Sequence, residues 1–238
     1  MLSGDLGLSL TVRPGASVWD LAMASGSRSA RLLIPAALLS LSLSLLLAWS
    51  GRRMRLLHAV SVMPVFLMAY LLVFSLNETA FALIQEGRIS RPSWFALPLN
   101  ESPVRSLVAI AVLATGSGAL SSLTGELAES MRHIRSSAWL EAARARGTPL
   151  LPHMLGNLLP PLLTGLASQI AFLTGGLIVI EKVLLLNGAG ALLWEAALQR
   201  DHPLAMGLAL LAAVVVCGAR LLANLGRVLI DPRLRVPR

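Results

Sequence analysis

The side chains that could do chemistry in this chain are not spaced as catalytic or metal-binding groups usually are. Histidine is a common metal ligand, but the four histidines are scattered and form no His-Glu-x-x-His pattern; they are His58, His133, His153 and His202. No serine has a plausible His-Asp pair, which nucleophilic catalysis by serine requires. We therefore expect no catalytic residue and no metal site.

Charged residues beside or within apolar stretches allow more than one interpretation. Glu126 and Glu129 are three residues apart and could relay protons, because acids within a membrane are often functional. We favour the simpler interpretation, a solvated pair with Arg132. Arg220 lies inside an apolar stretch; we favour packing or snorkelling over a pathway position facing an anionic group.

The most informative segment is short, rich in alanine and flanked by two long apolar stretches. Residues 138–146, AWLEAARAR, are good helix formers, and Ser136 or Ser137 could cap the start of the helix. Gly147 can take the left-handed conformation that ends a helix. The residues that such a helix would present are Trp139, Leu140, Glu141, Ala142, Ala143 and Arg144.

This helix would combine a bulky anchor, small residues and charges. Trp139, Leu140 and Ala143 would share one face, and Glu141 could pair with Arg144. A helix of this kind fits a groove on another protein. It could equally lie on lipid headgroups, which suit tryptophan and arginine. Residue chemistry alone leaves these two interpretations open.

The composition indicates an integral membrane protein. Hydrophobic residues make up 55% of the chain and charged residues 13%, with a mean hydropathy of +0.73. The formal net charge is +8. In a membrane protein, such an excess of arginine faces anionic lipid, so we expect no nucleic-acid partner. The single cysteine, Cys217, excludes an intrachain disulfide and a cysteine-based metal site.

Five segments are long and apolar enough to cross a bilayer, which takes about 20 residues. They cover roughly residues 32–50, 60–81, 104–123, 158–180 and 204–225. Because small residues let membrane helices approach closely, we assign Gly116, Gly118, Gly175 and Gly176 to helix packing or to a pathway. We expect an all-α, polytopic transmembrane bundle of about five spans.

The distribution of arginine predicts the orientation. The segments that would share a side with the 125–157 loop hold eleven basic residues, against eight on the other side. Because basic residues accumulate on the cytoplasmic side, we expect residues 125–157 and the C-terminus to be cytoplasmic. The N-terminus would then lie outside with residues 1–31, and residues 32–238 would form the membrane domain.

The stretch Ser130–Gly147 resembles the cytoplasmic EAA loop of permease subunits in ABC importers of the dipeptide, oligopeptide and nickel family. Weaker likenesses to the same family follow in the expected order. They are Gly4-Asp5-Leu6-Gly7 with Ser9, Gly175-Gly176 through Glu181, Gly188-Ala189-Gly190, Arg200-Asp201-His202-Pro203 with Gly207, and Asp231-Pro232-Arg233-Leu234-Arg235. The resemblance therefore runs from about Gly4 to Arg235.

The resemblance implies a type I ABC importer permease fold. Two permease subunits would form the pathway for peptides or a related small solute, such as nickel, a metal chelate or an opine. Two ATPases would dock on residues 139–144 and Gly147, the coupling helix and the bend after it, and an extracytoplasmic solute-binding protein would deliver the solute. ATP and Mg would bind to the partner subunits and no cofactor to this chain, which would be no enzyme. The implied location is the bacterial inner membrane.

Two departures from the family pattern leave alternatives open. Asn157 stands where a branched apolar residue is usual, and the family's usual first span has no counterpart. Either Met1 is a misplaced start or this subunit has five spans. The alternatives to a working permease are a membrane scaffold or assembly protein and a truncated paralogue that does not transport. The sequence predicts neither the solute nor whether the second permease is a copy of this chain.

Overall fold

The computed structural model describes residues 6–50, 63–87, 103–116 and 118–230, and each regular element in these ranges is a helix. In chain order the helices are α1 (Val18–Ser50), α3 (Val65–Gln85), α5 (Pro103–Thr115), α6 (Ala119–Arg135), α7 (Ala138–Ala145), α8 (Leu150–Val183), α9 (Ala189–Leu198) and α10 (His202–Ile230). Four are long and apolar enough to cross a membrane, and counting the bent pair α5 and α6 as one span makes five. The prediction of an all-α, polytopic bundle is confirmed.

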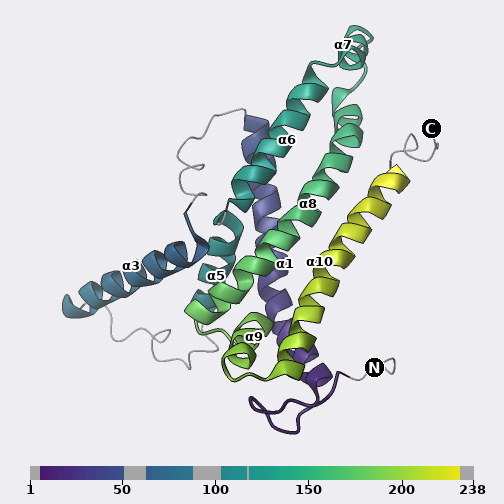
Figure 1. Ribbon diagram of the computed structural model, residues 1–238. Coiled ribbons are helices and arrows are strands. Elements are labelled where there is room, and N and C mark those ends of the chain that lie inside the picture. Colours follow the sequence, from purple (N-terminus) through teal and green to yellow (C-terminus); the bar gives the residue numbers. More distant parts are fainter. Residues whose placement is uncertain (1–5, 51–62, 88–102, 117, 231–238) are drawn as a thin grey trace.

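The long helices α1, α8 and α10 run side by side, and α6 continues along α8 to one end of the molecule (Figure 1). At that end α7 joins α6 to α8; we call it the α7 end. At the opposite end, here called the α9 end, α9 lies beside residues 6–17 (Figure 1). Helix α3 points away from the bundle and packs against it mainly through Val65 and Ala69.

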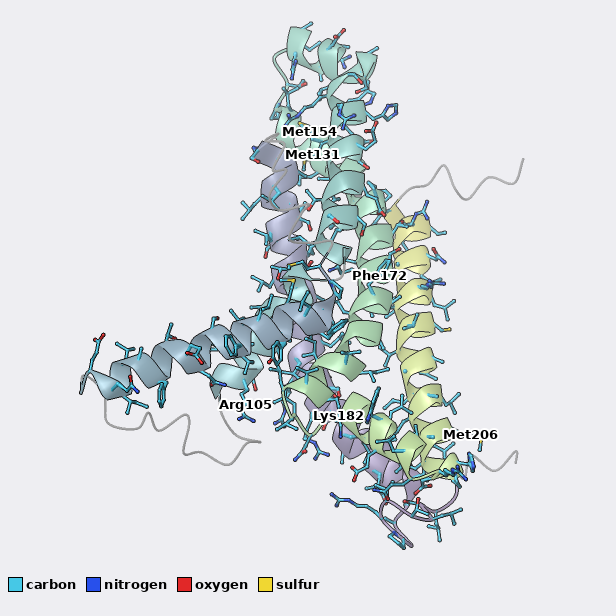
Figure 2. The ribbon with its side chains drawn as sticks, turned by 60° about the vertical axis from the view of Figure 1, so that its left-hand side comes forward. Arg105, Met131, Met154, Phe172, Lys182 and Met206 are labelled. Carbon is cyan, nitrogen blue, oxygen red and sulfur yellow. The ribbon has the colours of Figure 1, made fainter. Side chains whose placement is uncertain are left out.

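Three apolar clusters hold the helices together. The first lies where α1, α3, α5 and α8 meet, around Leu113 and Leu177. The second joins α1, α6 and α8 nearer the α7 end, where Met131 lies beside Met154 (Figure 2). The third, around Val18, joins α1, α9 and α10 at the α9 end. Helices α1 and α8 therefore contribute to these clusters along most of their length, whereas α10 contributes only near the α9 end.

Helix α1 begins at Val18, well before the predicted start of the first span near Leu32. The predicted boundary between residues 1–31 and 32–238 therefore falls inside a helix. The reason is packing rather than hydropathy: Val18, Ala22, Ser25 and Ser29 recur at helical spacing and are all buried. Serine and arginine lower the mean hydropathy of this stretch, although one of its faces is fully packed.

The predicted loop 125–157 is mostly helical, because α6 extends to Arg135 and α8 begins at Leu150. Leu127, Met131 and Ile134 form an apolar stripe that packs in the second cluster. The polar residues between them lie on the exposed face. With 34 residues, α8 is about 50 Å long, longer than the roughly 30 Å hydrocarbon core, so it has length to spare beyond a bilayer.

The predicted span 104–123 is not one straight helix. Helices α5 and α6 meet at an angle of 47°, and Gly118 at the start of α6 has a left-handed φ of 74°. The predicted spans 158–180 and 204–225 lie within the longer α8 and α10. Of the predicted span 60–81, α3 covers the part from Val65, and residues 60–62 lie outside the described residues.

Replacing Gly207 by alanine should destabilise the chain, because a Cβ there would overlap Cγ1 of the buried Val18. We expect Gly207→Ala to lower the free energy of unfolding by about 1–3 kcal/mol, as overpacking does. Gly218→Ala on the same helix is the matched control, since nothing lies within 4 Å of its Cβ. It should be neutral or stabilising by up to about 1 kcal/mol. Thermal unfolding of both variants in detergent measures the contrast, and equal melting temperatures would contradict this packing.

Candidate functional site

The tip of the α6–α8 hairpin is shaped mainly by backbone contacts. Ser137 precedes α7 in an extended conformation, but its hydroxyl donates back to the Ile134 carbonyl (2.5 Å) and does not cap α7. Gly147 has a left-handed φ of 67°. Thr148 then donates its amide (3.1 Å) and its hydroxyl (2.9 Å) to the carbonyl of Ala143. These bonds fix the turn from α7 into α8.

The exposed face of α7 differs from the one expected. Leu140 and Ala143 are buried within the chain and attach α7 to it, so they are not available to another protein. Trp139, expected on the same face, lies at its edge and is 38% exposed. The opposite face is free, and it carries Ala138, Glu141, Ala142 and Ala145, with Arg144 at its margin. A partner would therefore meet small and charged side chains.

The acidic residues near the α7 end are solvated. Glu129 and Arg132 form the predicted ion pair, with 2.7 Å between Oε2 and Nη1, and both side chains are exposed. Glu141 and Arg144 make no ion pair with a described residue. Glu126 and Glu129 line a cavity of about 660 Å³ together with Pro160, Pro161 and Arg227.

At the α9 end, the buried carboxylate of Glu181 joins α8 to α1 and α9. Its Oε1 accepts a hydrogen bond from the hydroxyl of Ser29 (2.5 Å), which itself accepts one from the amide of Ala189 (2.7 Å). Its Oε2 accepts the amides of Gly190 (2.8 Å) and Ala191 (3.1 Å). The carboxylate therefore occupies the first turn of α9, where the helix dipole favours negative charge.

This arrangement requires glycine at two positions. A Cβ on Gly188 would overlap the Glu181 carboxylate, and one on Gly190 would lie 2.5 Å from the backbone Cα of Ile178. Backbone atoms cannot move aside as a flexible side chain can. The spacing of Glu181, Gly188 and Gly190 along the chain therefore has a steric cause.

A second buried carboxylate, that of Asp201, fixes the segment before α1. Its Oδ2 accepts a hydrogen bond from the Ser9 hydroxyl (2.5 Å). The same oxygen accepts the amides of Leu10, Thr11 and Val12 at 3.0–3.2 Å. Its Oδ1 accepts the amide of Leu204 (3.3 Å) in the first turn of α10. Asp201 thus caps α10 and holds residues 9–12 at once.

Burial alone would raise the pKa of Asp201 above that of an ordinary aspartate. The hydrogen bonds from Ser9 and from the amides of Thr11, Val12 and Leu204 outweigh burial and hold the pKa well below its usual range. The carboxylate is therefore ionised at neutral pH, although no water reaches it.

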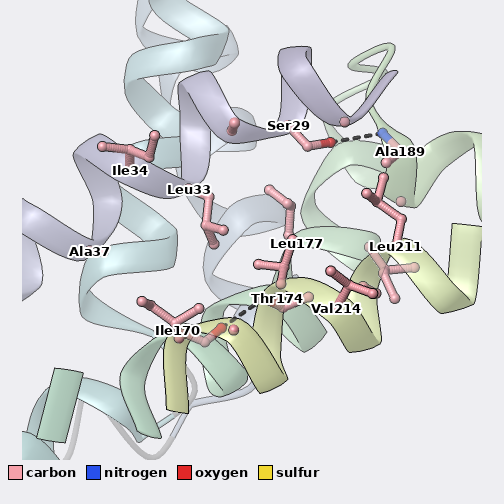
Figure 3. Close-up of a pocket in the computed structure, with 18 of the residues that line it drawn as sticks. Ser29, Leu33, Ile34, Ala37, Ile170, Thr174, Leu177, Ala189, Leu211 and Val214 are labelled. Carbon is pink, nitrogen blue, oxygen red and sulfur yellow. Dashed lines mark hydrogen bonds between the residues drawn. The ribbon is translucent and has the colours of Figure 1, made fainter. Parts of the chain in front are cut away.

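Two further cavities open between the helices away from the α7 end. One, of about 560 Å³, lies between α1, α8 and α10 and is lined almost entirely by aliphatic side chains, including Leu33, Ile170 and Leu177 (Figure 3). The other, of about 690 Å³, lies at the α9 end between α1, α9 and the loop after α8, and its wall is half polar.

The glycines assigned to packing or to a pathway divide into two kinds. A Cβ on Gly116 would lie 2.8 Å from Cγ2 of Val65, and one on Gly176 would lie 3.5 Å from Cδ2 of Leu113, so both are packing positions. Gly118 forms the bend before α6, and Gly175 faces open space. Arg220 is exposed on α10 and lines none of the three cavities described above.

The part of the chain that the structure describes adds no metal site to these features. Within the described residues, no group of three or more potential ligands comes together. His133 and His202 are exposed. His58, Gly4, Asp5 and residues 231–235 lie outside the described residues, as does the side chain of His153.

Sequence reasoning noted the motifs around Ser9, Glu181 and Asp201 but did not bring them together. Ser9 and Asp201 are 192 residues apart, and Ser29 and Glu181 are 152 apart. The signal that could have identified them is an acid placed just before or after a glycine-rich or helix-starting turn, where backbone amides lack partners. Their partners in the N-terminal part of the chain carry no such signal.

Comparison with known proteins covers most of the chain. Residues 48–236 match the family of the binding-protein-dependent transport system inner membrane component. The oligopeptide transport system permease protein AppB of Bacillus subtilis is 32% identical over 127 residues, which is 52% of this chain. The dipeptide transport system permease protein DppB of the same organism is 30% identical over 57% of the chain. DppB of Haemophilus influenzae is 24% identical over 73% of it.

The matching segments are shorter than the relatives themselves. They cover 40% of AppB and 44% and 57% of the two DppB proteins. The chain therefore aligns with less than two thirds of each relative, and these matches alone do not transfer a whole protein's activity to it.

Asp201→Asn should release the segment before α1. The asparagine side chain carries no charge, and its nitrogen donates hydrogen bonds instead of accepting them. We expect amide exchange in residues 9–18 to become at least about tenfold faster, the size of one lost charged hydrogen bond. Hydrogen–deuterium exchange of the detergent-solubilised protein measures this. Asp20→Asn is the control, since Asp20 is exposed on α1, and equal exchange in the two variants would contradict the role of Asp201.

The same contact should persist in acid. Because the folded-state pKa of Asp201 lies below its ordinary value, its contribution is complete above the unfolded-state pKa of about 3.9 and is lost only as pH falls through the lower, folded-state value. Exchange protection of residues 9–18, corrected for the intrinsic rate, should stay constant from about pH 7 to pH 4. A loss of protection centred between about pH 5 and 6 would show that another group holds the segment.

Proposed function

Because this chain belongs to the family of binding-protein-dependent transport system inner membrane components, we propose that it is a permease subunit of an ATP-driven peptide importer. Its multiple apolar helices make it a multi-pass protein of the inner membrane. Several relatives are named as oligopeptide or dipeptide transport system permease proteins, which supports a peptide as the solute. The observation that carries the proposal is the family match over residues 48–236, which includes the whole α6–α8 hairpin.

We propose that α7 is the coupling helix on which an ATPase subunit docks. The support is its place at the end of a hairpin that extends beyond the rest of the bundle (Figure 1). Its free face has small side chains at Ala138, Ala142 and Ala145, which allow close approach, and Glu141 and Arg144 offer charge. Trp139 lies at the edge of that face as a partly exposed anchor.

The hairpin also suits the transmission of movement. Leu140 and Ala143 attach α7 to the chain, and the turn at Gly147 is fixed by hydrogen bonds. A partner that moves α7 would therefore move the ends of α6 and α8 with it. Such a partner shifts the pathway between two states only if it binds them with different free energies. ATP and Mg would belong to that partner, and this chain would supply no catalytic group.

The remaining partners follow from the same proposal. The α7 end would face the cytoplasm and the α9 end the outside, where a solute-binding protein would dock. A second permease, identical or different, would complete the pathway. Helix α3 supports this, because it is apolar and almost wholly exposed within the chain. Among its exposed residues are Phe66, Tyr70, Phe74 and Phe81.

Ala142→Glu should abolish ATPase docking without harming the fold, because Ala142 is exposed on the free face of α7. We expect recovery of the ATPase subunit with the tagged chain to fall at least tenfold, and peptide uptake to fall with it. Ala197→Glu is the matched control, an exposed alanine on α9 at the opposite end. The test is affinity purification from native membranes in mild detergent, with melting temperature as the check on folding.

Each outcome of this experiment decides something. Loss of the ATPase in Ala142→Glu alone supports docking through α7. Normal recovery and uptake in that variant would rule out this face of α7. Failure of the unaltered, well-folded chain to recover any ATPase would favour the scaffold or the non-transporting paralogue.

A further inference from the structure

The polar cavity at the α9 end is lined by an uneven set of charges. Three arginines reach it, Arg13 from the segment before α1 and Arg28 and Arg31 from α1. Two acids also line it, Glu181 and Glu195. Its volume of about 690 Å³ falls within the range of about 300–1,000 Å³ found for small-molecule sites.

The two acids do not neutralise the three arginines. Both carboxylate oxygens of Glu181 already accept hydrogen bonds, from Ser29, Gly190 and Ala191. Arg28 is the arginine whose positive charge acts on the Glu181 carboxylate. Its Nε donates to the carbonyl of Asn187 (2.5 Å). Glu195 accepts one hydrogen bond at Oε1 from the side chain of Gln199 (3.3 Å) and forms no ion pair with a described arginine, so it keeps its charge for another partner.

Arg13 and Arg31 are left without such partners. Neither forms an ion pair with any residue in the described ranges, and both side chains are exposed. Arg13 is nevertheless held in place, since its amide donates to the Ser9 hydroxyl (3.0 Å), which is bonded to Asp201. Arg31 is one turn of α1 from Arg28. Two guanidinium groups thus stand at a common cavity with no ion pair to a described residue.

We propose that this cavity binds the carboxylate of the transported solute, through Arg31 and Arg13. The proposal rests on the proposed function, in which the α9 end receives solute from outside. A guanidinium group presents paired N–H donors whose geometry matches a carboxylate. Glu195 on the same wall offers a partner for an ammonium group, so a zwitterionic peptide finds a counterpart for both of its charges.

The same guanidinium groups could meet the phosphate of an anionic lipid headgroup. The occupant that we assign is the solute carboxylate, because the cavity combines the arginines with an acid, Glu195, and with Ser106 and Asn187. The phosphate of an anionic lipid without an amino group would use the arginines alone and gain nothing from the acid. The test therefore has to separate a peptide carboxylate from lipid.

The experiment uses protection of a cysteine placed in the cavity wall. Ser106→Cys lines the cavity, and Cys217→Ser removes the native exposed thiol. The complete importer, in nanodiscs of uncharged lipid, is labelled with the neutral reagent N-ethylmaleimide. The rate of labelling is measured in the presence of Ala-Ala-Ala, in the presence of its C-terminal amide, and without peptide. The series is repeated in Arg31→Gln, Arg13→Gln and the control Lys182→Gln.

Lys182 is the matched control because it is an exposed cation at the same end (Figure 2) and does not line the cavity. We expect Ala-Ala-Ala, but not its amide, to slow labelling. In Arg31→Gln the concentration for half protection should rise about tenfold or more, the size of one lost charged hydrogen bond. Arg13→Gln should act in the same direction, and Lys182→Gln should leave protection unchanged.

Three results would overturn the proposal. Equal protection by the acid and the amide would mean that the carboxylate is not recognised. No protection by either peptide, in an importer that takes up peptide with ATP, would mean that solute does not bind here. Slower labelling in nanodiscs of anionic lipid, without any effect of peptide, would assign the cavity to lipid. Absence of ATP-driven uptake by the unaltered importer would instead refute the proposed function.

Discussion

The α9 end depends on one requirement: a carboxylate removed from water must be surrounded by hydrogen-bond donors. Glu181 and Asp201 meet it in the same way, with one serine hydroxyl and several backbone amides each. Because these donors come from distant parts of the chain, satisfying the two acids fixes α1 against α8 and α9, and the segment before α1 against α10. The arginines at the polar cavity are held by this framework.

The opposite end is organised by apolar packing. A stripe on α6 and its counterpart on α8 keep the two helices together beyond the main bundle, and two buried side chains attach α7 to them. The contrast between the ends has a physical basis. A tip that projects from the bundle has few neighbours to supply polar partners, so its free face stays small and charged while its attachment is hydrophobic.

Hydropathy was sufficient to predict the helical class and the approximate positions of four of the spans. A run of about 20 apolar residues matches the length that a helix needs to cross a bilayer. The turn at Gly147 was also predictable, since glycine tolerates a positive φ. The early start of α1 and the length of α6 were not, because both depend on amphipathic faces that an average conceals. The burial of Leu140 and the partners of Asp201 were beyond local reasoning, since each depends on residues supplied by other helices.

The hydrogen bond between Ser9 and Asp201 can form only late in the synthesis of the chain. A chain emerging from the ribosome makes Ser9 first and Asp201 only 192 residues later, after the helices from α1 to α9 have been synthesised. Until Asp201 emerges, the amides of residues 10–12 lack their acceptor, and the segment before α1 is not held in place. Closure of this contact would therefore require synthesis to have passed Asp201, and a protein interrupted before its last helix would leave the segment before α1 loosely held.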